Sequence, residues 1–204
     1  MIAIIDYGVG NLFSLSSSFS YIGADVKITG DADEIRRADK LILPGVGAFE
    51  DAAKKLRDSG LASVICDEAK SGKSIMGICL GMQLLFEESL EYGRHKGLGL
   101  IPGTVEYMGD YIKSGLKIPH IGWNALDIKR QSGLLRYVKS GDFVYFVHSY
   151  FAKTDEKYIS STAEYGYPLT ATVENGNVMG CQFHPEKSGA VGLNILKAFC
   201  EDQR

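Results

Sequence analysis

The first half of the chain alternates short apolar runs with longer segments in which apolar residues recur every three or four positions. Short apolar runs are typical of buried strands, and the longer periodic segments are typical of helices that cover them. The alternation therefore predicts parallel strands connected by helices. We expect strands at residues 1–5, 25–28, 40–43 and 74–78, and helices at residues 12–22, 49–58, 61–69 and 80–89.

After about Gly97 the pattern changes to strands without helices between them. The Asn175-Gly176 pair is a strong hairpin signal between the last two strands. We expect an α/β fold with a mostly parallel central sheet, helices on both faces, and an extension of antiparallel strands. The second-half strands are expected at residues 104–107, 125–128, 143–151, 160–163, 171–174 and 178–183, followed by a helix at 192–200.

Size and charge limit what the chain can do. A length of 204 residues with 45% hydrophobic residues is enough for one sizeable core. Because no segment has the composition of a hinge, we expect a single domain over residues 1–204. Lys and Arg total 22 against 25 Asp and Glu, a net charge of -3, which gives no broad attraction to nucleic acid or to an anionic membrane. The expected ligand is a small molecule or another protein.

Targeting signals and cysteine spacing bear on the compartment. Asp6 interrupts the apolar start, no basic region precedes it, and no later stretch is long enough to span a membrane. The four cysteines have no C-x-x-C spacing. Reduced thiols and a cytoplasmic location are therefore expected.

The segment Gly77-Ile78-Cys79-Leu80-Gly81 joins a predicted strand to a predicted helix. Glycines on both sides of a nucleophile allow the cramped strand-to-helix turn of a nucleophile elbow, which exposes the central side chain. The helix N-terminus favours the thiolate form, and the amide of Leu80 is placed to donate into an oxyanion hole. The alternative is a buried structural cysteine, the role expected of Cys66, Cys181 and Cys200.

A thiol nucleophile needs a base, and the base needs a group that fixes its ring. His184 and Glu186 are two residues apart, so an extended backbone would place them on one side, with Glu186 behind the ring that faces Cys79. Taken alone, His184-Pro185-Glu186 is an ordinary end of a strand, but the elbow favours the catalytic interpretation. The remaining histidines, His95, His120 and His148, have no carboxylate two residues away, and their spacing suggests no metal site.

The loop Pro44-Gly45-Val46-Gly47-Ala48 follows the third predicted strand. It lacks the Lys-Ser/Thr pair of a phosphate-binding P-loop and is too short for the dinucleotide fingerprint. Its two glycines permit a peptide flip. An oxyanion loop opposite Cys79 is therefore the better interpretation.

These motifs resemble the class I, triad-type glutamine amidotransferases, whose G-x-C-x-G-x-Q and late H-P-E patterns match Gly77 to Gln83 and His184 to Glu186. Within that family, the chain is similar to the glutaminase subunits of imidazole glycerol phosphate synthases. The similarity covers essentially the whole chain. The further matching segments are Asp6-Tyr7-Gly8-Val9-Gly10-Asn11, Pro44-Gly45-Val46-Gly47, Ile121-Gly122-Trp123-Asn124 and His148-Ser149-Tyr150.

The resemblance implies a reaction that needs neither a cofactor nor a metal. Cys79 attacks the side-chain amide of glutamine to give a γ-glutamyl thioester, His184 protonates the departing ammonia, and water then releases glutamate. The amides of Val46 and Leu80 form the oxyanion hole, that of Val46 only after its loop reorients. The residues implied to hold the rest of the substrate are Gly47, Gln83, Glu91, Ser149 and Tyr150.

The family also implies a partner. Ammonia passes to a (β/α)8-barrel cyclase subunit, with which the chain forms a heterodimer, and Asn11, Trp123 and Lys187 match positions facing that partner. For Trp123 the alternative is a plain core role, and for Lys187 a solvated charge. Three other functions stay open at this point: a stand-alone thiol hydrolase of γ-glutamyl compounds, the glutaminase subunit of another amidotransferase, and a binding module without catalysis.

Overall fold

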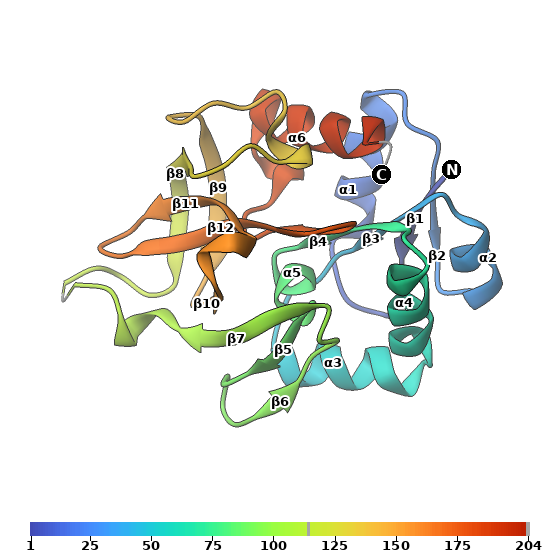
Figure 1. Cartoon of the computed structure of the whole chain (residues 1–204), viewed down its shortest axis with the longest axis horizontal. Coiled ribbons are helices and arrows are strands. Elements are labelled where there is room, and N and C mark those ends of the chain that lie inside the picture. Colours follow the sequence, from blue (N-terminus) through green and yellow to red (C-terminus); the bar gives the residue numbers. More distant parts are fainter. Residues whose placement is uncertain (114, 203–204) are drawn as a thin grey trace.

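The computed structural model describes residues 1–113 and 115–202. Across these residues the main sheet has nine strands in the order β2-β1-β3-β4-β13-β12-β11-β8-β9 (Figure 1). The strands are β1 (Ile2–Ile5), β2 (Val26–Thr29), β3 (Lys40–Leu43), β4 (Ser74–Ile78), β8 (His120–Ile128), β9 (Phe143–His148), β11 (Ile159–Glu164), β12 (Pro168–Asn175) and β13 (Val178–Cys181).

The sheet has a parallel half and an antiparallel half. Strands β2, β1, β3, β4 and β13 run parallel to their neighbours. From β13 onward, each pair through β12, β11, β8 and β9 is antiparallel. The expected α/β architecture, a parallel sheet extended by antiparallel strands, is confirmed.

Helices cover both faces because successive residues of the buried strands point to opposite sides. Ile2 and Ile4 belong to the core cluster that contains Leu15 and Phe19 of α1, whereas Ile5 belongs to the cluster on the other face. Helices α1 and α6 lie on one side of the sheet, and α3, α4 and α5 on the other (Figure 1). The helices are α1 (Leu12–Tyr21), α2 (Ala32–Arg37), α3 (Phe49–Asp58), α4 (Leu61–Lys70), α5 (Leu80–Leu84) and α6 (Gly189–Glu201).

A second, smaller sheet lies beside α5 and α3, with strand order β10-β7-β5-β6 (Figure 1). Its strands are β5 (Phe86–Ser89), β6 (His95–Lys96), β7 (Ile101–Tyr107) and β10 (Tyr150–Lys153). Short 3-10 turns complete the described part: η1 (Met108–Asp110), η2 (Gly133–Leu135), η3 (Glu156–Tyr158) and η4 (Pro185–Lys187).

The predicted helix over residues 80–89 is wrong in its second half. Helix α5 ends at Leu84, and β5 begins at Phe86 and pairs in parallel with β7, Phe86 opposite Ile101. Leu84, Leu85 and Phe86 are all buried, so their apolar run fits a helix and a strand equally well. Pairing with a distant strand decides between the two.

The predicted strand over residues 143–151 is divided at Ser149. Strand β9 pairs with β8 in the main sheet, whereas β10 pairs with β7 in the small sheet. The helix α2 was not predicted, because it has six residues of which only Ile35 is buried; its local signal is Asp31, whose carboxylate accepts the N–H of Glu34 at 2.9 Å. The hairpin at Asn175-Gly176 is confirmed, with Asn175 opposite Val178.

The remaining cysteines follow the predictions in part. Cys181 is buried in β13, as expected. Cys66 and Cys200 are only half-buried, because they lie on the margins of α4 and α6 rather than in the core. In the described ranges no helix is long and apolar enough to cross a membrane.

Candidate active site

Cys79 stands at the turn between β4 and α5 with φ 54° and ψ -113°. A positive φ is rare for a residue other than glycine and is the backbone feature of a nucleophile elbow. Glycine is required on both sides. A Cβ on Gly77 would lie 2.6 Å from the carbonyl oxygen of Gly81, and one on Gly81 would lie 1.8 Å from that of Leu43. The two glycines let the helix lie directly on the ends of the strands, and the predicted strand-to-helix turn at Cys79 is present.

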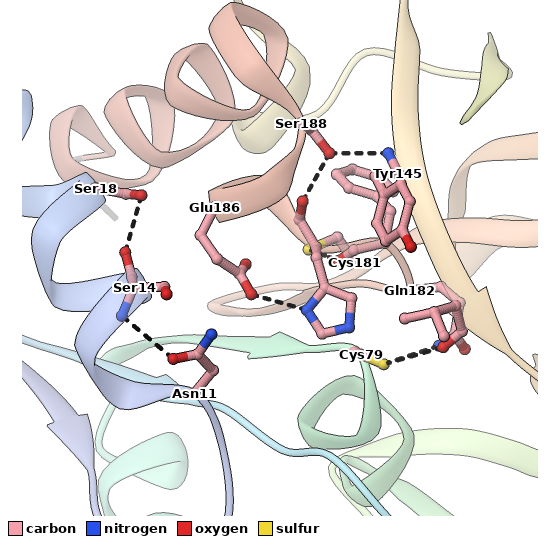
Figure 2. A network of polar contacts seen from close by, with 12 residues as sticks. Asn11, Ser14, Ser18, Cys79, Tyr145, Cys181, Gln182, Glu186 and Ser188 are labelled. Atoms are coloured by element: carbon pink, nitrogen blue, oxygen red, sulfur yellow. Dashed lines mark hydrogen bonds and ion pairs between the residues drawn. The ribbon is translucent and has the colours of Figure 1, made fainter. Parts of the chain in front are cut away.

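His184 is buried beside this turn, and Glu186 contacts its ring at Nδ1. The Nδ1 atom of His184 lies 2.8 Å from Oε1 of Glu186, the contact drawn at Glu186 in Figure 2. A carboxylate only accepts, so Nδ1 bears the proton and Nε2 is left for the pocket, which His184 lines together with Cys79. The structure therefore brings the three predicted residues Cys79, His184 and Glu186 into one site, and their catalytic role stays a prediction.

Main-chain pairing places the thiol and the imidazole together. Strands β4 and β13 are parallel neighbours, with Ile78 opposite Cys181, so Cys79 and the segment before His184 leave the sheet at the same edge. The amide of Cys79 donates to the carbonyl of Cys181 at 2.8 Å, and the amide of His184 donates to the carbonyl of Tyr145 at 2.9 Å. Both backbones are thereby fixed.

The predicted route from His184 to Glu186 is wrong, although the contact is present. Pro185–Lys187 forms the 3-10 turn η4, and only His184 is extended, with φ -97° and ψ 101°. The turn brings the carboxylate back toward the ring. Ser188 stabilises it by donating its hydroxyl to the carbonyl of His184 at 2.6 Å.

The electrostatics of His184 favour the protonated ring. Burial lowers the pKa of His184, but hydrogen bonds and charge interactions with Cys79 and Glu186 raise it, and the net pKa is about 9 against an ordinary 6.5. Because this pKa is raised on folding, the stabilisation is present below pH 6.5 and is lost as the pH rises through about 9. The site therefore holds an imidazolium at neutral pH.

Replacing Glu186 by glutamine is expected to lower the pKa of His184 by roughly one unit or more, because it removes the negatively charged carboxylate that accepts the hydrogen bond from the ring N–H. The measurement is an NMR pH titration of the His184 ring. Glu91→Gln is the matched control, since Glu91 is a carboxylate of the same pocket without a contact to His184. An unchanged titration in Glu186→Gln would show that the carboxylate does not tune the ring.

The Pro44 to Ala48 loop lies across the turn from Cys79. The Tyr7 hydroxyl donates to the carbonyl of Pro44 at 2.7 Å, and Gly47 has φ +96°. The far end is held by Glu91, whose Oε2 accepts the amide of Phe49 at 2.6 Å. The loop is thus fixed at both ends, while Val46 between them is 44% exposed.

One pocket of about 440 Å³ brings the predicted residues together. This volume is in the range of sites for small molecules. Glu186 is the one catalytic candidate outside the lining, because it lies behind His184. The lining contains Cys79, His184, Val46, Leu80, Gly47, Gln83, Glu91, Ser149 and Tyr150, together with Tyr92, Tyr107, Ile118, Val147 and His148.

The three positions expected to face a partner lie outside this pocket, and all are exposed. Trp123 is 52% exposed, which rules out a plain core role. It packs edge-on against Tyr145 with ring centroids 5.9 Å apart, and Nζ of Lys187 lies 5.9 Å from the same Tyr145 ring. Asn11 caps α1 by accepting the amide of Ser14 at 3.4 Å. Trp123 and Lys187 therefore belong to one surface cluster around Tyr145.

Sequence reasoning missed Gln182, which is fully buried beside the thiol. Its Nε2 lies 3.8 Å from Sγ of Cys79 (Figure 2), and its Oε1 accepts from Gln83 at 3.0 Å. Its position two residues before His184, at the end of the strand predicted over residues 178–183, was the available signal.

A buried histidine pair, of which His148 lines the pocket and His120 does not, was also missed. Nδ1 of His120 is 3.1 Å from Nε2 of His148, and Nδ1 of His148 donates to the carbonyl of Tyr150 at 2.9 Å. Burial lowers the pKa of His148 to about 3, so that ring is neutral near pH 7. In the described part of the chain no group of three or more His, Cys, Asp or Glu residues could hold a metal ion.

The sequence matches the profile of the family described as glutamine amidotransferase class-I over residues 3–202. A curated relative from Caldanaerobacter subterraneus subsp. tengcongensis, imidazole glycerol phosphate synthase subunit HisH, is 51% identical over 202 residues, covering 98% of both chains. The protein of the same name from Bacillus licheniformis is 50% identical, covering 98% of this chain and 95% of that one.

Solved structures match at lower identity. A crystal structure of a glutamine amidotransferase aligns with a TM-score of 0.75 and 18% identity, covering 97% of this chain and 98% of that one. The structure of PurLQS from Thermotoga maritima aligns with a TM-score of 0.76 and 22% identity, covering 97% of this chain and 96% of that one. At these identities the likeness shows the fold alone.

Proposed function

This chain belongs to the class-I glutamine amidotransferase family, and we propose that it hydrolyses glutamine at Cys79 and supplies the ammonia to a cyclase partner in histidine biosynthesis. The observation that supports this most directly is the single pocket in which Cys79, His184 and the oxyanion and substrate candidates meet. The relatives at about half identity, all imidazole glycerol phosphate synthase subunits by name, support the pathway.

In the first half of the reaction the thiolate of Cys79 attacks the side-chain carbonyl carbon of glutamine. The oxygen becomes an oxyanion, stabilised by the amides of Leu80 and, once the loop has reoriented, Val46. The His184 imidazolium gives its proton to the departing nitrogen, so ammonia leaves and a γ-glutamyl thioester remains. The raised pKa of His184 keeps that proton available at neutral pH.

In the second half, water attacks the thioester carbonyl while the now neutral His184 accepts a proton from it. The tetrahedral intermediate collapses, the C–S bond breaks, and glutamate leaves with the thiolate restored. Glu186 stabilises the imidazolium at each stage through its 2.8 Å contact with Nδ1.

The amino acid end of glutamine is held by the remainder of the pocket. Glu91 supplies a carboxylate for the substrate ammonium, and Gly47, Gln83, Ser149 and Tyr150 complete the wall. Because Glu91 also accepts the amide of Phe49, an ammonium at Glu91 competes with the contact that holds the end of the oxyanion loop. Substrate binding and loop position are thus linked through one carboxylate.

We further propose that residues 1–204 form one amidotransferase domain, supported by the family match over residues 3–202. The partner is a (β/α)8-barrel cyclase subunit that forms a heterodimer with this chain in the cytoplasm. Asn11, Trp123 and Lys187 contribute to the contact surface. The exposure of Trp123 and of its neighbour Ile121, 59% exposed, supports this surface.

The test is glutamate release by the purified chain, measured alone and with a barrel cyclase subunit and its ligand. The expected result is low release alone and an increase of about 10²-fold or more in the complex, because loop reorientation completes the oxyanion hole. Full activity of the isolated chain would support a stand-alone γ-glutamyl hydrolase instead. Stimulation by the synthetase subunit of another pathway, and not by the barrel, would support a different amidotransferase.

The alternative that the chain is a binding module without catalysis is tested on the same complex. A glutamine analogue with an electrophilic side chain should modify Cys79 and leave Cys66, Cys181 and Cys200 unmodified, as read by peptide mass spectrometry. Failure to modify Cys79 in the stimulated complex would contradict the proposed function.

A further inference from the structure

We propose that Gln182 binds the thiolate of Cys79, with its amide N–H directed at the sulfur by a chain of hydrogen bonds that begins at the backbone carbonyl of Tyr150. The proposal rests on the proposed function of Cys79 and adds a residue to its machinery. Gln182 is fully buried, and it is absent from the lining of the substrate pocket.

The direction of the chain follows from what each group can donate. The carbonyl of Tyr150 only accepts, so the atom of Gln83 that faces it at 3.0 Å is Nε2. The same Nε2 lies 3.0 Å from the Gln182 side chain, which must present its Oε1 to this second donor. The NH2 end of Gln182 is then the end that faces Sγ of Cys79, at 3.8 Å.

This orientation of the Gln182 amide has a chemical consequence for the thiol of Cys79. A reversed amide would direct an oxygen at the sulfur and oppose ionisation, whereas an N–H stabilises the negative charge. The amide of Gln182 is thus a donor to the sulfur at 3.8 Å, whereas the carbonyl of Val147, 4.0 Å from the sulfur, can only accept from the neutral thiol. Figure 2 shows Gln182 and Cys79 joined directly, with Glu186 on the far side.

The Gln182→Glu substitution keeps the shape of the side chain and an oxygen for Gln83, but puts a carboxylate oxygen beside the sulfur. We expect the pH profile of Cys79 alkylation by iodoacetamide to move to higher pH by about one unit or more. Gln182→Met has similar length and no donor, and it should slow alkylation at neutral pH about three- to tenfold. Alkylation of Cys66 in the same sample is the internal reference.

In the complex with the partner, Gln182→Glu should lower kcat for glutamate release with KM changed less than about twofold, because Gln182 does not line the pocket and the variant keeps an acceptor for Gln83. Ser161→Ala is the matched control. Ser161 is also fully buried and hydrogen-bonded, to Thr172 at 2.7 Å, without contacting Cys79. It should reproduce any loss of stability and leave the alkylation profile unchanged.

A measurement on the unaltered chain covers the case in which a variant does not fold. The side-chain NH2 resonances of Gln182, followed by 15N NMR against pH, should shift with the same midpoint as Cys79 alkylation. The proposal would be overturned if Gln182→Glu and the parent gave superimposable alkylation profiles. It would also be overturned if the side-chain NH2 resonances of Gln182 did not change over the pH range in which Cys79 ionises. If the parent released no glutamate in the complex, the proposed function itself would fail, which is a separate result.

Discussion

Replacing Cys79 by alanine is expected to abolish glutamine-driven synthesis in the complex, by on the order of 10⁴-fold or more, while the cyclase partner continues to use added ammonium. The thioester cannot form without the sulfur, and water in its place lacks the required nucleophilicity. Because an alanine side chain is smaller than that of cysteine and fits the buried turn, the fold should persist.

The experiment measures the same product with glutamine and with an ammonium salt as nitrogen source. The ratio of the two rates separates loss of the nucleophile from loss of the complex, because a misassembled complex would lose both. Cys66→Ala is the control, a half-buried thiol on α4 whose removal should leave both rates unchanged. Residual glutamine-driven turnover near the parent rate would mean that Cys79 is not the nucleophile.

Gly81→Ala is expected to have the largest effect on the fold. Its Cβ would lie 1.8 Å from the carbonyl oxygen of Leu43 and 3.1 Å from the carbonyl carbon of Pro44, both backbone atoms that no rotamer change can move. Helix α5 must then lift from β3, which displaces the oxyanion loop as well as Cys79. We expect a loss of about 3 kcal/mol or more in the free energy of unfolding, together with loss of rapid thiol alkylation.

Urea unfolding measures the stability change, and Gly60→Ala is the comparison. Gly60 has φ +75°, and an added Cβ there meets nothing within 4 Å. Gly60→Ala should therefore lower the free energy of unfolding by about 1 kcal/mol, from the unfavourable backbone conformation alone. Equal destabilisation by the two substitutions would show that α5 tolerates displacement and that the glycine is not required for close packing.

The parallel strands of the first half and the meeting of the triad candidates in one site could be predicted from the sequence because both depend largely on local patterns. The apolar runs before Asp6 and before Cys79 are too short for helices, and glycines on either side of Cys79 leave few structures for the turn. The spacing of His184 and Glu186 acquired its catalytic interpretation only together with the glycine-flanked Cys79. The contact with Glu186 was predicted even though the backbone reaches it through a 3-10 turn.

The parts that could not be predicted depend on pairing between distant strands. Nothing local separates Leu84 at the end of α5 from Phe86 at the start of β5, and the division at Ser149 arises because β9 and β10 have partners in different sheets. Gln182 is a related case. A buried glutamine has meaning only once its donors and acceptors are known, and these come from α5 and from the backbone beside Ser149.

The place of β13 in the sheet has a consequence for the order in which the chain becomes active during synthesis. β13 follows every other strand in the sequence, yet it is inserted between β4 and β12, near the middle of the sheet. His184 follows β13 in the sequence, so a growing chain that lacks the neighbour of β4 also lacks the predicted base. On the proposed mechanism, glutamine hydrolysis therefore requires the strand that joins the two halves of the sheet, and an unfinished chain is expected to consume no glutamine.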